Sequence, residues 1–285
     1  MREQDRLGDC TEGRFAGLSV RPWQATLGAL LVCSCLARPA AQEAASPRHL
    51  SEMVVLGPDD FVMGTGIHPL EPLRRVTVGR FAIDRVEVTV AKYRTFLNAG
   101  GTVAKSGSAD CNLGNPAMSD HPVNCVSWDE AEQYCRWSGT RLPTEVEWEY
   151  AARGPEGREY AWGAPMPSAT RMNALDQSCV AADTALAADD APFPWNDGFC
   201  TTAPVGRYPS GATPQGVLDL AGNVWEWTSS DCLVDEPTCS ESHKILRGGG
   251  FWLSDPYVLR AAVRRAEPRA ARSMMFGFRC AKSLD

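Results

Sequence analysis

The sequence predicts one loop-rich α+β domain with few helices and short antiparallel strands, and three kinds of observation support this. Short apolar runs bounded by turn residues occur between residues 53 and 83 and again after residue 243, as expected for strands. Three segments carry residues that begin helices. Between them, residues 154–243 are rich in Gly, Pro, Asp and Asn and show no sustained hydrophobic period, which is typical of loops.

The strand-like segments lie at the two ends of the domain. Those near its start are residues 53–56, 61–64, 75–78 and 81–83. Those near its end are residues 244–247, 249–252, 257–263 and 277–280. We find no internal repeat and no second block of composition, so one domain is the simplest organisation.

The helices are predicted from their first residues. Thr89 can cap a helix that runs through Leu97, and Gly100 follows as a stop. Ser127-Trp-Asp-Glu130 is a capping box, in which the Ser hydroxyl and the Glu carboxylate satisfy the free N–H groups of the first turn. Thr144-Glu-Val-Glu147 repeats this pattern and predicts a third helix.

Charge and cysteine content limit the classes of function. The net charge is −7, and no Lys/Arg-rich face stands out, which argues against a nucleic-acid-binding protein. Eight of the 11 cysteines lie in the globular part, with no C-x-x-C motif. An even set of this kind indicates disulfides rather than a zinc site. Disulfides in turn indicate an oxidising compartment.

The first 41 residues are predicted to direct export. The apolar run of residues 25–36 is too short to span a membrane and has the length of a signal-peptide core. Val32-Cys-Ser-Cys35 resembles a lipobox, which would make Cys35 a lipidated residue and a membrane tether. The alternatives are a plain signal peptide cut near Ala37 or Ala41, or no signal at all. The corresponding location is periplasmic or outer-membrane lipoprotein, or secreted.

We therefore expect three parts: a signal in residues 1–41, a flexible tether in residues 42–52, and a domain in residues 53–282. Across that domain, several segments resemble the formylglycine-generating-enzyme (sulfatase-modifying-factor) family in the same order. The most specific is Gly139-Thr-Arg-Leu-Pro-Thr-Glu-Val-Glu-Trp-Glu-Tyr-Ala-Ala-Arg-Gly154. The other main segments are residues 83–89, 121–135, 216–227, 247–249 and 277–280. The resemblance implies a loop-rich, C-type-lectin-related α+β fold.

The resemblance also implies structural calcium. Calcium takes six to eight oxygens from carboxylates, amides and backbone carbonyls. The family pattern for a first site matches Asn173, Ala174, Asp197 and Phe199. A second site matches Gly222, Asn223, Val224 and Glu226. The alternative is that these Asn and Asp residues only cap turns.

The family's catalytic cysteine pair is missing. Active members hold Cu(I) with two cysteines, four residues apart, between the Arg-Gly-Gly strand and the final Gly-Phe-Arg; soft thiolates are the fitting ligands for that ion. Here the interval from Arg247 to Arg279 contains no cysteine, and the comparable segment is Gly250-Phe-Trp-Leu-Ser-Asp-Pro-Tyr-Val-Leu259. We therefore expect neither copper binding nor formylglycine formation.

The remaining cysteines have structural partners. In some family members the positions of Cys135 and Cys280 are bridged. Neighbouring cysteines then suggest the pairs Cys111–Cys125, Cys179–Cys200 and Cys232–Cys239. Scrambled or partly free thiols are the alternative.

The sequence gives little support for other catalytic or binding sites. The four histidines form no metal-binding motif, and neither a G-x-S-x-G nor a P-loop motif occurs. Five arginines between residues 260 and 272 would bind an anion or, more simply, form a solvated strand face paired with acids. The Glu-Pro-Asn and Gln-Pro-Asp tripeptides of sugar-binding C-type lectins are absent.

The leading hypothesis is a non-catalytic, extracytoplasmic family member that binds a protein, peptide or glycan or has a structural role. The alternative is an oxidoreductase or protein-modifying enzyme whose chemistry has moved within the same site. The sequence names neither the ligand nor the partner.

Overall fold

The computed structural model describes residues 52–68, 71–102, 111–182, 192–232, 239–240 and 242–284. The predicted signal in residues 1–41, with Cys35, lies outside the described residues, as does the tether up to residue 51. Within the described part, no helix is long and apolar enough to cross a membrane.

Four α-helices are described, and three of them begin where the sequence predicts. They are α2 (Val90–Asn98), α3 (Trp128–Trp137), α4 (Glu145–Arg153) and α5 (Gln177–Ala182). The Thr89 side chain accepts a hydrogen bond from the Lys92 N–H. The capping boxes of α3 and α4 are complete, with both reciprocal hydrogen bonds formed. The short helix α5 was not predicted, because it lies in the loop-rich region and carries no capping signal.

In the described part of the chain, nine short strands form three sheets. In chain order they are β1 (Met53–Leu56), β2 (Asp59–Met63), β3 (Arg74–Val78), β4 (Phe81–Asp84), β5 (Trp225–Asp231), β6 (His243–Arg247), β7 (Arg264–Pro268), β8 (Phe276–Gly277) and β9 (Ala281–Ser283). The sheet orders are β1-β4-β9, β2-β3 and β7-β6-β5-β8. All pairs are antiparallel except β5 with β8. Because β4 pairs with both β1 and β9, the first and last strands share one sheet.

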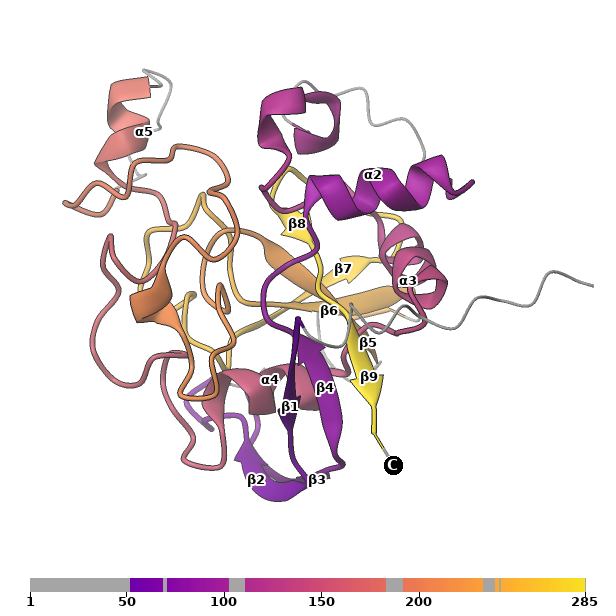
Figure 1. The fold of residues 1–285 in the computed structure, drawn as a ribbon. Coiled ribbons are helices and arrows are strands. Elements are labelled where there is room, and N and C mark those ends of the chain that lie inside the picture. Colours follow the sequence, from indigo (N-terminus) through magenta and orange to yellow (C-terminus); the bar gives the residue numbers. More distant parts are fainter. Residues whose placement is uncertain are drawn as a thin grey trace, which may run out of the picture. The chain divides into compact units, whose positions relative to one another are not determined.

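Two main hydrophobic clusters lie on the two sides of the domain. One joins α2 and α3 to β5 and β8, and the other joins α4 to β1, β2 and β4. Figure 1 shows α2 beside α3 at one end and α4 beside β1 and β4 at the other. The long connections between α4 and β5 fill the remaining side (Figure 1). The fully buried Trp148 and Trp227 both donate their indole N–H, to Glu226 and to the Val126 carbonyl.

Two strand predictions near the end of the chain were wrong, and a third, residues 277–280, overlaps a strand only at Gly277, because residues 278–280 lie between β8 and β9. Residues 249–252 and 257–263 form turns and bends, and the strand lies further along, at β7. These apolar residues are held by packing rather than by pairing: Leu259 and Ala261 are buried without belonging to a sheet. A short apolar run does not distinguish a strand from a buried turn.

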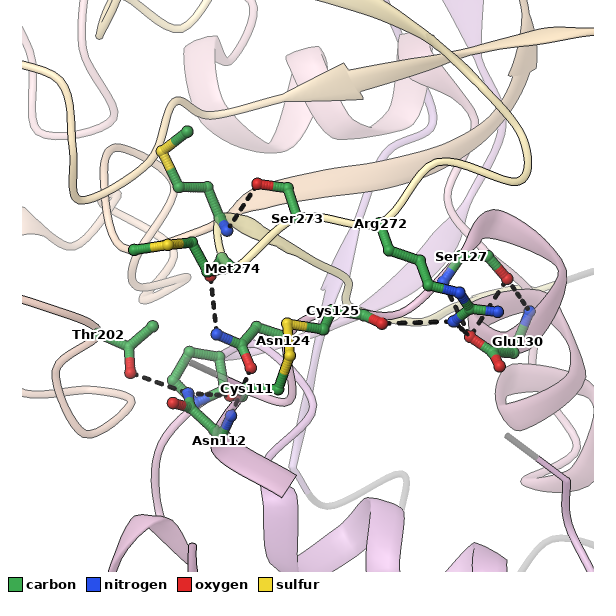
Figure 2. The surroundings of a disulfide bond; sticks show 12 residues. Cys111, Asn112, Asn124, Cys125, Ser127, Glu130, Thr202, Arg272, Ser273 and Met274 are labelled. Atoms are coloured by element: carbon green, nitrogen blue, oxygen red, sulfur yellow. Dashed lines mark hydrogen bonds and ion pairs between the residues drawn. A yellow bond between two sulfur atoms is a disulfide. The ribbon is translucent and has the colours of Figure 1, made fainter. Parts of the chain in front are cut away.

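Four disulfides staple the described part, and they are the four pairs that the sequence suggests: Cys111–Cys125, Cys135–Cys280, Cys179–Cys200 and Cys232–Cys239. Figure 2 shows the first of them between Asn112 and Asn124. The Asn112 N–H donates to the Asn124 amide oxygen at 2.7 Å, and the Asn124 amide donates to the Met274 carbonyl at 2.7 Å. This staple therefore also fixes the segment that leads into β8.

Replacing Cys135 and Cys280 together by alanine should lower the free energy of unfolding by about 2–5 kcal/mol. Their bridge spans 145 residues and joins α3 to the start of β9. Its loss therefore increases the conformational entropy of a long segment of the unfolded chain. The measurement is urea denaturation followed by tryptophan fluorescence. The control is the Cys232 and Cys239 pair, which spans 7 residues and should cost less. Equal costs for the two double variants would contradict the explanation.

Candidate functional site

The first predicted calcium set is brought together between α4 and β5. Asn173 is almost completely buried, and its amide nitrogen donates to the Thr201 carbonyl at 2.8 Å and to the Asn223 amide oxygen at 3.0 Å. Its own amide oxygen is buried and has no hydrogen-bond partner among the described residues. An unpaired buried oxygen is costly unless a ligand satisfies it.

Asp197 lies directly against this position. Its carboxylate accepts hydrogen bonds from the Ala174 N–H at 3.0 Å and from the Phe199 N–H at 2.9 Å. Burial raises the pKa of the Asp197 carboxyl to about 7; these two N–H donors act in the opposite direction, and the nearby Asp176 adds to the rise. The ionised carboxylate is therefore poorly stabilised by the protein alone at neutral pH, and a bound cation would favour it.

The residues of this first set fit calcium. The ion requires hard oxygen ligands, and the set offers the free Asn173 amide oxygen, the Asp197 carboxylate and backbone carbonyls of Ala174 and Phe199. The described residues contain no cluster of three or more His, Cys, Asp or Glu side chains suited to a metal. Amide and carbonyl oxygens would thus supply most of the ligands.

The second predicted set fits less well, because its side chains have other partners. Both Glu226 oxygens accept hydrogen bonds from Arg279, at 2.6 and 2.7 Å, and one also accepts from the Trp148 indole at 2.7 Å. The Asn223 amide oxygen accepts from Asn173 and from the Ala203 N–H. The structure thus neutralises Glu226 with a guanidinium, and the geometry favours a structural role for it.

The backbone of residues 222–224, from the second set, positions Asn173 of the first set. Gly222 has a φ of +74°, and a Cβ there would lie 2.0 Å from the Asn173 carbonyl oxygen, so only glycine allows the approach. Asn223 is also left-handed, with a φ of +56°. The next residue, Val224, is fully buried. The Gly-Asn-Val turn therefore holds Asn173 in place.

Two buried carboxyls beside this turn were missed in the sequence. Glu87 accepts a hydrogen bond from the Asn223 amide at 2.9 Å, and Asp219 accepts one from the Gly206 N–H at 2.5 Å. Burial raises the pKa of both carboxyls, and each is close to other acids. Both lie in segments that carry the family resemblance, 83–89 and 216–227. That resemblance was the signal by which the sequence could have identified them.

The segment that should carry catalytic cysteines is instead part of an apolar cluster. Leu253 and Val258 pack against the buried Tyr160, Met172 and Leu259. Three half-buried aromatic side chains complete the surface of this cluster: Trp162, Phe193 and Trp195. Tyr160 stacks on Trp162 with ring centroids 5.1 Å apart, and Phe193 on Trp195 at 4.7 Å. We call these four rings with Leu253 and Val258 the aromatic cluster.

The described part of the chain contains no free cysteine thiol. All eight cysteines there are joined in disulfides. The aromatic cluster contains no titratable group other than Tyr160, and burial raises the pKa of that hydroxyl. The Tyr160 hydroxyl donates to the Pro256 carbonyl at 3.1 Å.

A disulfide-stapled, loop-rich α+β domain with this Gly-Asn-Val-Trp-Glu turn defines the class of protein. Residues 39–284 match the family described as the sulfatase-modifying factor enzyme 1-like domain. The chain therefore belongs to this family, as the sequence resemblance predicted.

Similar proteins include both enzymes and a protein named as inactive. The chain is 33% identical to the formylglycine-generating enzyme of Streptomyces coelicolor, with 85% of this chain and 92% of the relative covered. It is 31% identical to the hercynine oxygenase of Mycolicibacterium smegmatis, covering 80% of this chain and 58% of that protein. It is 30% identical to the inactive C-alpha-formylglycine-generating enzyme 2 of Bos taurus, covering 80% and 87%.

A solved structure supports the fold. The structure of PvdO from Pseudomonas aeruginosa is 26% identical and superposes with a TM-score of 0.62, covering 81% of this chain and 94% of that one. The loop-rich, C-type-lectin-related α+β fold predicted from the sequence is confirmed.

Calcium should raise the melting temperature of the metal-free protein by several degrees, because an ion that binds only the folded state stabilises it by mass action. Asp197→Asn should remove most of this rise, since the strongest ligand is lost. The measurement is thermal unfolding with added calcium or with a chelator. The control is Asp60→Asn, which changes an exposed aspartate on β2 and should leave the rise intact. An unchanged melting temperature in the unaltered protein would argue against a structural ion.

Proposed function

We propose that this chain is an exported binding domain that uses the family fold without the family's copper-dependent oxidation of cysteine. One observation carries the proposal: the interval from Arg247 to Arg279, where active members hold a cysteine pair, contains no cysteine, and its segment 250–259 contributes the apolar Leu253 and Val258 to the aromatic cluster. Neither side chain can bind copper or form a redox pair. The disulfide-bonded cysteines elsewhere in the described part offer no replacement.

The aromatic cluster supports a role in binding. Half-buried aromatic rings offer large contact areas at low cost in conformational entropy, and they suit a peptide side chain or the apolar face of a sugar. Trp162 and Trp195 each stack on a neighbouring ring, so their orientation is fixed before a ligand arrives. The ligand class we propose is accordingly a peptide or a glycan.

The proposal includes calcium and export. Calcium at Asn173, Ala174, Asp197 and Phe199 would order the loop-rich side of the domain, on which the aromatic cluster lies. Four disulfides are expected in an oxidising compartment, which supports export, and the proposed lipid anchor is Cys35. The domain would then act outside the cytoplasm, in the periplasm, at the outer membrane or in the medium.

The relatives support two hypotheses about the function of this site. The bovine relative carries the word inactive in its name, which is consistent with a family member that has lost catalysis. The hercynine oxygenase relative favours the alternative, an enzyme with different chemistry on the same scaffold. The apolar lining of the aromatic cluster leads us to prefer the first.

The protein should show neither tight Cu(I) binding nor oxygen consumption with a cysteine-containing sulfatase peptide. Both depend on a thiolate pair, which the site lacks. The measurements are competition for Cu(I) with a colorimetric chelator and an oxygen electrode, with an active formylglycine-generating enzyme as positive control. Conversion of the peptide cysteine would overturn the proposal, and oxygen uptake without conversion would favour the alternative enzyme.

Trp195→Ala should weaken ligand capture if the aromatic cluster is the binding surface. The probes are a phage-displayed peptide library and a glycan array, screened with the unaltered protein in calcium. The matched control is Trp137→Ala, which removes the exposed tryptophan of α3 and should preserve the captured set. Loss of one well-oriented ring is expected to weaken binding about 10-fold or more. Equal capture by both variants would place the binding surface elsewhere.

A further inference from the structure

A second region of the domain, beside the aromatic cluster, gathers buried arginines. Glu149 on α4 is fully buried and forms ion pairs with two guanidinium groups. Its Oε1 lies 2.7 Å from Arg153 Nη1, and its Oε2 lies 2.7 Å from Arg247 Nη2. Arg247 also pairs with Glu145 at 2.7 Å, and Glu145 is shared with Arg264. These carboxylates are divided between several cations.

Arg260 and Arg74 add further positive charge beside this network. Arg260 is buried, and its Nη2 lies 3.3 Å from the nearer oxygen of Glu71. Glu71 also accepts hydrogen bonds from the hydroxyls of Thr65 and Tyr257. Arg74 contacts the Met63 sulfur at 3.6 Å, and its Nε is buried without a hydrogen-bond partner among the described residues.

The carboxylates of this set are ion-paired with arginines. Glu145 and Glu149 each pair with two arginines, and Glu71 pairs with Arg260.

The accessible end of this set is a pocket of about 240 Å³. Arg153 and Arg260 both line it, together with Thr65, Ile67, Gly157 and Glu159. We call it the arginine pocket. It shares no residue with the aromatic cluster. Its volume is below the ~300–1,000 Å³ of sites for drug-sized ligands, so it suits a single terminal residue or one small acid.

Both guanidinium groups have N–H donors left for a ligand. Arg260 uses Nε for the Tyr257 carbonyl and Nη2 for Glu71, and its guanidinium lies over the Tyr257 ring, 3.9 Å from the ring centroid. We assign the N–H groups of Nη1 to the ligand. The Nη2 of Arg153 makes one contact, with the Gly157 carbonyl at 3.2 Å. Two arginines with spare donors form the usual recognition site for a carboxylate.

The rim of the arginine pocket is apolar. Ile67 lines it and is 67% exposed, and Leu73, 60% exposed, lies against Gly66 in the same hairpin loop. Exposed aliphatic side chains beside a cationic pocket favour a ligand that joins a carboxylate to an apolar arm. A strongly hydrated inorganic anion would not use this rim.

We propose that the arginine pocket binds a carboxylate carried by a small group with an apolar arm, such as the C-terminal residue of a peptide. Arg153 and Arg260 bind the carboxylate, and Ile67 contacts the apolar arm. This site goes beyond the proposed function and does not depend on it, because it holds whether or not the aromatic cluster binds a ligand.

The test is isothermal titration calorimetry on the full domain with N-acetyl-leucine, whose carboxylate and side chain match the pocket. For a ligand of this size we expect a Kd on the order of 1 mM. N-acetyl-leucinamide, which lacks the charge, should not bind, and glucuronate and sulfate distinguish an acidic sugar or an inorganic anion as the source. Equal binding of the amide, or tighter binding of sulfate, would overturn the proposal.

Two variants locate the site. Ile67→Glu places a negative charge on an exposed rim position and should abolish N-acetyl-leucine binding, whereas Ile67→Gln should retain it. Arg260→Gln should also abolish binding, with the exposed Arg265→Gln on β7 as its matched control. Unchanged affinity in Ile67→Glu would refute the site even if Arg260→Gln failed to fold. Trp195→Ala should bind N-acetyl-leucine normally, so failure here is distinguishable from failure at the aromatic cluster.

Discussion

The buried ion pair between Arg279 and Glu226 is the interaction on which the rest of the domain depends. Both side chains are fully buried, and both oxygens of Glu226 bind the guanidinium. Arg279 also donates to the carbonyls of Asp84, at the end of β4, and of Leu218. Burial would lower the pKa of Arg279, but the Glu226 carboxylate raises it above its ordinary value. Losing either partner would leave an uncompensated buried charge, which is strongly destabilising.

This ion pair also positions the candidate site. Glu226 is the second residue of β5, which follows the Gly-Asn-Val turn directly, and Arg279 also binds the Leu218 carbonyl on the other side of that turn. The turn is thereby fixed in its left-handed conformation at Gly222 and Asn223. Asn173 then meets Asn223, and Asp197 meets Ala174. The loop-rich side of the domain is organised from this point, with few regular elements of its own.

The sequence predicted elements well where the signal was local. Each capping box needs only four consecutive residues, so the starts of α3 and α4 could be read directly. The turns at residues 257–263 could not be distinguished from a strand, because burial without pairing depends on distant neighbours. The arginines after residue 260 were expected to be solvated, but Arg260 and Arg264 are buried. Their acidic partners, Glu71 and Glu145, are more than 100 residues away in the chain.

By itself, the sequence determined the family, the fold class, the starts of three helices and the absence of cysteine from residues 247–279, and it suggested the disulfide pairs. These follow from motifs and composition that act locally or are shared across the family. Only the tertiary structure showed that Glu226 forms an ion pair with Arg279, and that the Asn173 amide oxygen has no hydrogen-bond partner among the described residues. The same holds for the arginine pocket. Partners that are distant in sequence share one set of donors and acceptors, and only packing decides which of them meet.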